Sequence, residues 1–279
     1  NTAIGGLAGD AITTGHSNTL IGYAAGSAGT TSDGNPAFNN NVMIGHQAGM
    51  LAAEGGQNTF IGAYSGDAVV TGDNNTCVGY GTGTNLLSGP GNVLMGYNAG
   101  AAMTDGDYNV AIGFEAADSL VGAANDNIAI GKGALGASTN ATTKNIAIGS
   151  NALSANVAAA SINVAIGYEA GDAITSGTHN TLVGHQAGST IATNGSMTAI
   201  GHTALQLATG SNNTAVGVSS GKEIAAGAGN TSLGANSLYY AGDGSDGTES
   251  YNTAIGSAAF YNLDHDDAEG NTAVGESAG

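Results

Sequence analysis

Hydrophobic and polar residues recur along this chain with a period close to 17 residues. A phrase of the type Asn-Thr-Ala-Ile-Gly begins at residues 1, 18, 41, 58, 75, 92, 109, 127, 145, 163, 180, 197, 213, 230, 252 and 271. We number the places of each repeat from this first residue. Place one is Asn in every copy except Met197, place four is always apolar, and place five is always Gly. A fixed short period of this kind predicts a stack of structural repeats in which each repeat contacts its neighbours.

Places two to four have the composition of a short β-strand, because they are rich in β-branched residues and too short for a helix. Side chains alternate between the two sides of a strand, so places two and four share one side and place three takes the other. Both sides are apolar or nearly so, and we expect one to line the core while the other packs against a second copy of the chain. The place-four residues are the predicted core: Ile4, Ile21, Ile44, Ile61, Ile112, Ile130, Ile148, Ile166, Ile200 and Ile255.

A weaker second strand is predicted around place twelve, which is often aliphatic, as at Val69 and Ile174. Each repeat then forms one rung of strand, turn, strand and turn. The sequence therefore predicts an all-β fold, a parallel β-solenoid or β-roll of about 16 rungs with a ~17-residue period. We expect residues 1–279 to form a single array with longer insertions at about 30–40 and 239–251. Since the printed sequence starts and stops inside the repeated phrase, we also expect a segment of a longer fibre.

The Asn and Gly columns have structural interpretations. The Asn column is either an inward ladder of side-chain amides or a column of turn residues, and its position after a Gly-containing loop favours the turn. The Gly column marks a positive φ angle or the close approach of a neighbouring backbone. The predicted turn residues are represented by Asn18, Gly22, Asn109, Gly113, Asn163 and Gly167.

Composition and charge exclude several classes of partner. Lys and Arg together number 3 against 21 Asp and Glu, which gives a net charge of −18. Nucleic-acid binding needs clustered cations, and so does binding to an anionic membrane surface. The sequence has no apolar run of the ~18 residues that a membrane span requires. We therefore expect neither a nucleic-acid partner nor membrane insertion.

Candidate metal-binding residues are few. The only cysteine, Cys77, cannot form a disulfide or a thiolate metal site within one chain. The histidines lack metal-ligand spacing, and three of them, His46, His185 and His202, share place six with several aromatic residues. We interpret place six as a surface or inter-chain aromatic position. No cofactor is expected except Ca²⁺, for which turn carboxylates are weak candidates: Asp243, Asp246, Asp264 and Asp266.

The insertions supply the candidate binding residues. Loops on a rigid scaffold commonly carry recognition. Phe38 lies in the first insertion, and Tyr239 and Tyr240 lie at the second. We expect these three side chains to contact a ligand or receptor.

The repeat also resembles a known group of proteins. The phrases NTAIG and NVAIG, followed by Ala-Gly or by Ala-Leu as at Ala134-Leu135, resemble the repeats of phage and bacterial fibre proteins. Such arrays often precede a chaperone domain of the endosialidase type. The phrase is also similar to the head repeat of YadA-like trimeric autotransporter adhesins, which implies a left-handed β-roll with three rolls around one axis. The resemblance implies a homotrimer at the surface of a cell or virion.

The function expected from this combination is structural and adhesive. The chain is predicted to be a rigid segment of an extracellular phage tail fibre or surface adhesin, with a cell-surface glycan or receptor as partner. No catalytic triad or carboxylate pair can be singled out, so we expect no enzyme activity. The alternatives are an ice-binding solenoid, suggested by the Thr residues at place two, and a polysaccharide depolymerase that uses carboxylates between chains.

Overall fold

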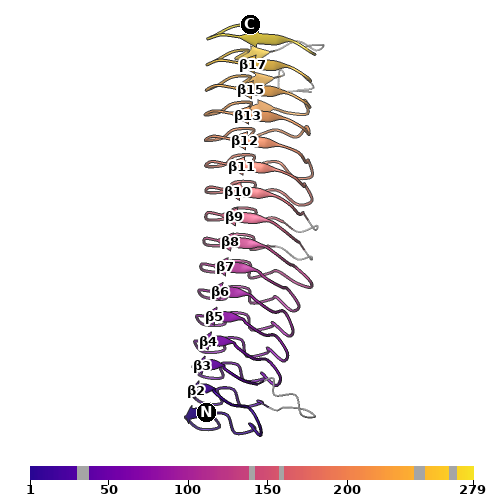
Figure 1. The fold of residues 1–279 in the computed structure, drawn as a ribbon. Helices are drawn as coiled ribbons and strands as arrows, with labels where there is room; N and C mark the ends of the chain where they lie inside the picture. Colours follow the sequence, from indigo (N-terminus) through magenta and orange to yellow (C-terminus); the bar gives the residue numbers. More distant parts are fainter. Residues whose placement is uncertain (30–37, 138–141, 157–159, 242–248, 264–268) are drawn as a thin grey trace. The chain divides into compact units, whose positions relative to one another are not determined.

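The computed structural model describes residues 1–29, 38–137, 142–156, 160–241, 249–263 and 269–279. The chain divides into two compact units, Asn1–Lys144 and Asn145–Gly279, which are called unit 1 and unit 2. Each unit contains eight copies of the repeat, and each copy forms a strand at places two to four (Figure 1). The prediction of one array over residues 1–279 stays a prediction, while within each unit the repeats stack as expected.

Unit 1 is a parallel sheet of three-residue strands that pair in sequence order. The strands are β1 (Thr2–Ile4), β2 (Thr19–Ile21), β3 (Val42–Ile44), β4 (Thr59–Ile61), β5 (Thr76–Val78), β6 (Val93–Met95), β7 (Val110–Ile112) and β8 (Ile128–Ile130). Identical places pair with one another, as when Ala111 aligns with Ala129. A side chain in one rung therefore lies beside the same place of the next rung.

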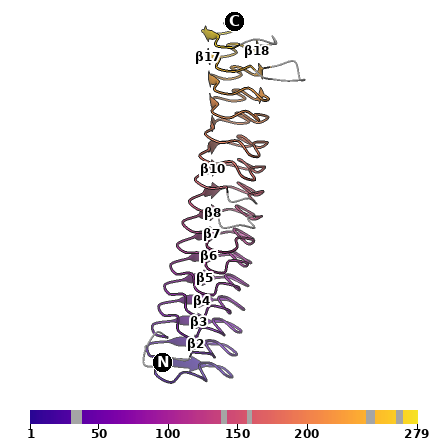
Figure 2. The same ribbon diagram turned by 90° about the vertical axis from the view of Figure 1, so that its right-hand side faces the viewer.

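Unit 2 repeats this arrangement and adds a second, smaller sheet. Its main strands are β9 (Ile146–Ile148), β10 (Val164–Ile166), β11 (Thr181–Val183), β12 (Thr198–Ile200), β13 (Thr214–Val216), β15 (Thr231–Leu233), β17 (Thr253–Ile255) and β19 (Thr272–Val274). The second sheet is formed by β14 (Glu223–Ile224), β16 (Tyr240–Ala241) and β18 (Asn262–Leu263), again in parallel. Seen from the side, the main strands lie along one edge of each unit and the turns along the other (Figure 2).

The predicted fold class is confirmed. The chain is an all-β parallel β-solenoid with a period near 17 residues. The eight main strands of each unit enclose seven complete turns of the solenoid, which gives about 14 turns for the two units. The predicted second strand is correct only for β14, β16 and β18. Elsewhere in the described ranges the place-twelve side chains do point inward, as buried Val69 and Ile174 show, but their backbone forms turns instead of a ladder.

The side of the main strand that faces the core is opposite to the one predicted. Every place-three side chain from Leu20 onward is buried, whereas the predicted core residues Ile21, Ile44, Ile112, Ile130 and Ile148 are only half-buried. Ile4, Ile61, Ile166, Ile200 and Ile255 are exposed. The interior of one rung is narrow, so a large side chain enters at place three only where place nine is Gly, and the place-four aliphatics are left on the outer side.

The Asn column is an inward ladder, so the turn interpretation of Asn18, Asn109 and Asn163 was wrong. Asn109 shows the pattern. Its backbone N–H donates to Oδ1 of Asn92 at 2.9 Å, its own Oδ1 accepts from the N–H of Asn127 at 3.0 Å, and its Nδ2 donates to the carbonyl of Ala124 at 2.6 Å. Because buried amides must be satisfied, this ladder fixes the register of the rungs and ties down the final turn of each one.

The Gly column has both properties expected of it. Gly113 adopts a φ of +140°, and a Cβ added there would lie 2.7 Å from the carbonyl oxygen of Gly131 in the next rung. Both the backbone angle and the space exclude a side chain at place five. The same constraint applies to Gly22 and Gly167, which have φ angles of +134° and +138°.

In eleven of the sixteen rungs, one of places three and nine holds the larger side chain and the other a small one. Where place three is large, as in Leu94 or Phe60, place nine is Gly, and a Cβ added at Gly100 or Gly66 would lie within 2.9 Å of those side chains. Where place three is Ala or Ser, place nine is often larger, and the pairs are Ala129 with Leu135, Ala147 with Leu153, Ala199 with Leu205, Ser232 with Leu238, and Ala254 with Phe260. The two places therefore share one volume of the core.

Candidate functional site

The first candidate surface is an apolar strip on the outer side of the main sheet, formed by places four and six. Place four contributes the aliphatic side chains that the core does not contain. Place six follows the Gly of place five. It contributes an aromatic ring or a histidine in eight of the sixteen repeats, and a charged residue only at Lys132 and Glu276. In unit 2, for example, Ile166 is 38% exposed and Tyr168 is 45% exposed. Contiguous exposed apolar surface of this kind marks an interaction site in a soluble protein.

The rings of the apolar strip in unit 1 contact one another from rung to rung. Tyr23, His46, Tyr64, Tyr80, Tyr97 and Phe114 form a continuous series with ring centroids 5.1–5.7 Å apart. Five of these rings come from place six, whereas Tyr64 comes from place seven. The expectation that His46 lies at a surface aromatic position is thereby confirmed. Aromatic contacts of this geometry stabilise neighbouring rungs by about 0.5–1.5 kcal/mol per pair.

Unit 2 has a shorter stack of the same kind. Tyr168 stacks on His185 at 5.1 Å, and His185 stacks on His202 at 5.0 Å. The carboxylate of Glu169 accepts a hydrogen bond from Nε2 of Gln186 at 2.8 Å. A hydrogen bond from Tyr168 and this bond from Gln186 lower the pKa of Glu169. His185 and His202 are thus exposed aromatic positions, as predicted for place six.

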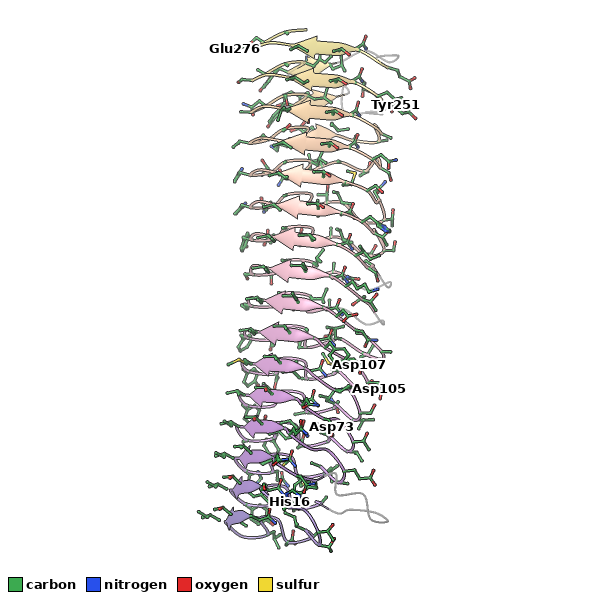
Figure 3. All side chains as sticks on the ribbon, viewed as in Figure 1. His16, Asp73, Asp105, Asp107, Tyr251 and Glu276 are labelled. Atoms are coloured by element: carbon green, nitrogen blue, oxygen red, sulfur yellow. The ribbon has the colours of Figure 1, made fainter. Side chains whose placement is uncertain are left out.

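Figure 3 distinguishes the two edges of the sheet. In unit 1 it shows Asp73, Asp105 and Asp107 at the edge where the chain enters the strands. In unit 2 Tyr251 lies at that edge, whereas Glu276, a place-six residue, lies where the chain leaves the strand. The acidic turn residues are part of the scaffold, because Oδ1 of Asp73 accepts from the N–H of Gly56 at 2.7 Å and Oδ1 of Asp105 accepts from Ser88 at 2.9 Å.

Phe38 does not lie at the surface, contrary to what the predicted ligand contact requires. Its side chain is fully buried, and a Cβ added at Gly29 would lie 2.8 Å from its ring. Its carbonyl accepts from Nδ2 of Asn18 at 3.0 Å, so Phe38 takes the position that the final turn occupies in other rungs. The buried ring of Phe38 therefore anchors the chain in the core at the point where it re-enters the rung.

Tyr239 and Tyr240 do lie at the surface, and a third ring that the sequence analysis did not identify lies beside them. Tyr239 is half-buried, Tyr240 is 36% exposed and Tyr261 is 45% exposed. Tyr239 and Tyr261 stack with centroids 5.3 Å apart and planes 11° apart, and Tyr240 stands at 69° and 80° to them. Tyr239 and Tyr261 share place ten of successive rungs, and this spacing is the signal that could have connected them.

Two charged groups complete this cluster. The Lys222 ammonium group donates to the Tyr239 hydroxyl at 3.0 Å, lies 5.2 Å from the centroid of its ring, and is 3.9 Å from the carboxylate of Glu223. This hydrogen bond from Lys222 to Tyr239 is the main cause that raises the pKa of Lys222. Strand pairing places Glu223 beside Tyr240, and Tyr240 beside Asn262. We call Lys222, Glu223, Tyr239, Tyr240, Tyr261 and Asn262 the tyrosine cluster.

Metal binding finds no support in the residues that the structure describes, where no group of three or more His, Cys, Asp or Glu is arranged to hold an ion. The Ca²⁺ candidates Asp243, Asp246, Asp264 and Asp266 lie outside the described residues. Cys77 is buried, and desolvation raises the pKa of its thiol to about 12, so it is no nucleophile. Across the described ranges no helix is long and apolar enough to traverse a bilayer.

The fold and these surfaces define a β-solenoid repeat protein. Comparison with protein-family models gives no match for this chain, and comparison with curated proteins gives none either. The resemblance to fibre and adhesin repeats thus stays a prediction from the repeated phrase.

Proposed function

We propose that this chain is a structural segment of an extracellular fibre in which copies of the chain pack together through the apolar strip, most simply as a homotrimer. The observation that carries the proposal is the outer side of the main sheet. It presents aliphatic side chains along both units and stacked rings over part of each, in a protein whose net charge is −18. Electrostatic repulsion between such acidic chains opposes their association, and burial of an apolar surface between them can outweigh it.

The regularity of the apolar strip also supports self-association. A parallel sheet is normally covered on both faces, and here one face lines the core of the solenoid. Rungs repeat at about 4.8 Å, so a second copy with the same period can match the strip rung for rung. A partner of unrelated structure would match the strip only over a few rungs.

A charge placed in the strip tests this proposal. Ile166→Asp places a carboxylate on the apolar strip, and burying it unpaired between copies costs several kcal/mol. We expect the parent protein to have the mass of several chains by light scattering and the variant to have the mass of one, with its β-sheet circular dichroism retained. Ile112→Asp and Ile130→Asp should act in the same way.

Leu207→Asp is the matched control, because Leu207 is about as exposed as Ile166 but lies at place eleven, outside the strip. Its mass should equal that of the parent. A parent protein with the mass of one chain at every concentration would contradict the proposal. Equal loss of mass in Ile166→Asp and Leu207→Asp would also do so, because the effect would then not belong to the strip.

One observation favours ice binding as a second candidate. The ladder of unit 2 aligns six threonines at place two in successive rungs, namely Thr181, Thr198, Thr214, Thr231, Thr253 and Thr272. Each rung offers one threonine beside an aliphatic residue, so the array of hydroxyls is a single column. Thermal hysteresis of the purified protein, abolished by Thr214→Tyr, would support this candidate over the fibre.

A further inference from the structure

The tyrosine cluster differs from the other aromatic positions of the chain. In unit 1 the rings follow one another along places six and seven with no charged group between them. In the tyrosine cluster three rings come from places ten and eleven, and a lysine and a glutamate lie at the same places one rung earlier. The cluster coincides with the second sheet, so β14, β16 and β18 hold its side chains in a fixed register.

Two rings of the cluster are accessible. Tyr240 makes edge-to-face contacts with Tyr239 and Tyr261 and is still 36% exposed. Tyr261 is stacked against Tyr239 on one face and is 45% exposed. An aromatic face carries a negative quadrupole and attracts C–H groups that bear partial positive charge. The axial C–H groups of a pyranose ring form such a surface.

The polar groups of the cluster suit the hydroxyl groups of a sugar. The Lys222 ammonium group has three donors, of which Tyr239 takes one, and Glu223 supplies acceptor oxygens. The hydroxyls of Tyr240 and Tyr261 and the exposed amide of Asn262 both donate and accept. Lys222 and Glu223 lie 3.9 Å apart, so their charges balance and the cluster presents no net charge to a ligand.

We infer that the tyrosine cluster is a binding site for the pyranose rings of a neutral glycan. Tyr240 and Tyr261 provide the apolar platforms, while Lys222, Glu223 and Asn262 bind hydroxyl groups at their edge. The cluster spans three rungs, roughly 10 Å at the spacing of parallel strands, which accommodates a short stretch of a polysaccharide. The inference rests on the proposed role as an extracellular fibre, because polysaccharides of this kind are encountered outside the cell.

Electrostatics favour a neutral glycan over an acidic one. The chain carries a net charge of −18, and Lys222 is one of only three cationic residues besides His. Its charge is already balanced by Glu223 and its ammonium group is bonded to Tyr239. An anionic sugar would therefore meet a repulsive protein and no free cation in the cluster.

Affinity electrophoresis tests the inference with the intact chain. Gels that contain dextran, mannan or galactan serve as neutral probes, and gels that contain polygalacturonate serve as the acidic probe. We expect at least one neutral polysaccharide to retard the parent protein. Tyr240→Ala and Tyr261→Leu should weaken that binding at least tenfold, and Tyr261→Phe, which keeps the ring, should weaken it less than threefold.

Tyr251→Asn is the control, because Tyr251 is an exposed tyrosine of unit 2 outside the cluster, and Asn tolerates its φ of +61°. It should bind like the parent. Tyr261→Leu retains apolar contact with Tyr239, and thermal melting of each variant separates lost binding from lost folding.

Three results would overturn the inference: no retardation by any neutral polysaccharide, preferential binding of polygalacturonate, or binding that survives both Tyr240→Ala and Tyr261→Leu. Light scattering on the same samples measures whether the chains still associate, so the test of the glycan site stays distinct from the test of the proposed fibre. A glycan-binding failure with the multi-chain mass intact rejects the glycan site alone. A change of mass in Tyr240→Ala would instead assign the cluster to contacts between copies.

Discussion

At the scale of single residues, the place-one asparagines fix how successive rungs align. Each one satisfies a backbone N–H of the next rung and a carbonyl at the end of its own rung, groups that would otherwise be buried without partners. The ladder is thus a polar network inside an apolar core, and every rung depends on the side chain below it.

Replacement of Asn109 by Ala should destabilise unit 1 by roughly 2–6 kcal/mol. It leaves the N–H of Asn127 and the carbonyl of Ala124 unpaired in the interior, at about 1–3 kcal/mol for each group. Chemical denaturation followed by circular dichroism measures the loss. Asn85→Ala is the control, because Asn85 makes an exposed hydrogen bond to Ala101, and its effect should stay below ~1 kcal/mol. Equal losses would contradict a role specific to the ladder.

Asp67 gives a prediction about pH at the same scale. Desolvation raises the pKa of this carboxyl, and its Oδ1 is buried without a hydrogen-bond partner. A raised pKa in the folded state means that the ionised form is disfavoured by folding. The resulting loss of stability is fully present above the raised pKa and absent below the unfolded value of 3.8. Asp67→Asn should therefore stabilise the protein at pH 7, and this gain should vanish as the pH falls below about 4.

The matched control is Asp10→Asn, which changes the same place and the same charge at an exposed position. Melting temperatures of the parent and both variants between pH 3 and pH 8 give the comparison. A constant difference between Asp67→Asn and the parent across that range would show that the carboxyl of Asp67 is not perturbed by burial.

At the scale of the rung, the volume shared by places three and nine sets which substitutions are tolerated. Leu94 fills the space beside Gly100, whereas Ala129 leaves that space to Leu135. Place nine adopts a left-handed backbone angle in both cases, with φ of +62° at Gly100 and +54° at Leu135. The larger residue at this place costs about 1 kcal/mol of backbone strain, which its burial offsets.

Exchange of the two sizes tests this arrangement in unit 1. Leu94→Ala alone should cost about 2–5 kcal/mol through the cavity it leaves. Gly100→Leu alone should cost about 1–3 kcal/mol through overpacking. The double variant should be more stable than the sum of both effects by at least ~1 kcal/mol, measured by denaturant unfolding. Gly100→Leu combined with Leu182→Ala in unit 2 should be additive, and additivity in the Leu94 pair as well would refute the shared volume.

At the scale of the whole molecule, the period, the strand positions and the Gly column could be predicted from the sequence. These follow from local rules, because β-branched residues and a required Gly determine backbone conformation within a rung. The direction in which the strand faces could not be predicted from hydrophobicity, because Ile at place four is more apolar than Ala at place three. Side-chain size, more than hydrophobicity, determines which side of the strand faces the core, because the interior of a rung is too narrow for a large residue at every place.

Two of the incorrect predictions are connected. Places one and three lie on the same side of the strand, so an inward Asn requires an inward place three. The interpretation of Asn as a turn residue removed that constraint, and Ile112 was then assigned to the core in place of Ala111. One signal in the sequence could have corrected this. Place nine is small where place three is large, as in Gly100 with Leu94, and large where place three is small, as in Leu135 with Ala129, which indicates that places three and nine share the interior.

The candidate binding residues were only partly predictable. Tyr239 and Tyr240 were identified from their position at an insertion, and they lie at the surface. Phe38 was chosen by the same rule and is buried, because an insertion changes where the chain re-enters the rung and an aromatic residue can fill that point. Tyr261 and Lys222 were missed because they become neighbours of Tyr239 only when successive rungs are aligned. All three occupy place ten of their repeats, and the sequence shows this only when place ten is compared across repeats.

The in-register alignment of identical places has a consequence for how such a chain can change length. Each rung meets the same places in its neighbours, although their side chains can differ, as Phe60 and Cys77 do. A duplicated stretch of one period can therefore insert between two rungs with every place still aligned. Gain or loss of whole periods is then nearly neutral, whereas gain or loss of a single residue within a strand disrupts every contact at that level. The number of rungs within one unit is thereby free to vary, and so is the length of the stack that this unit forms.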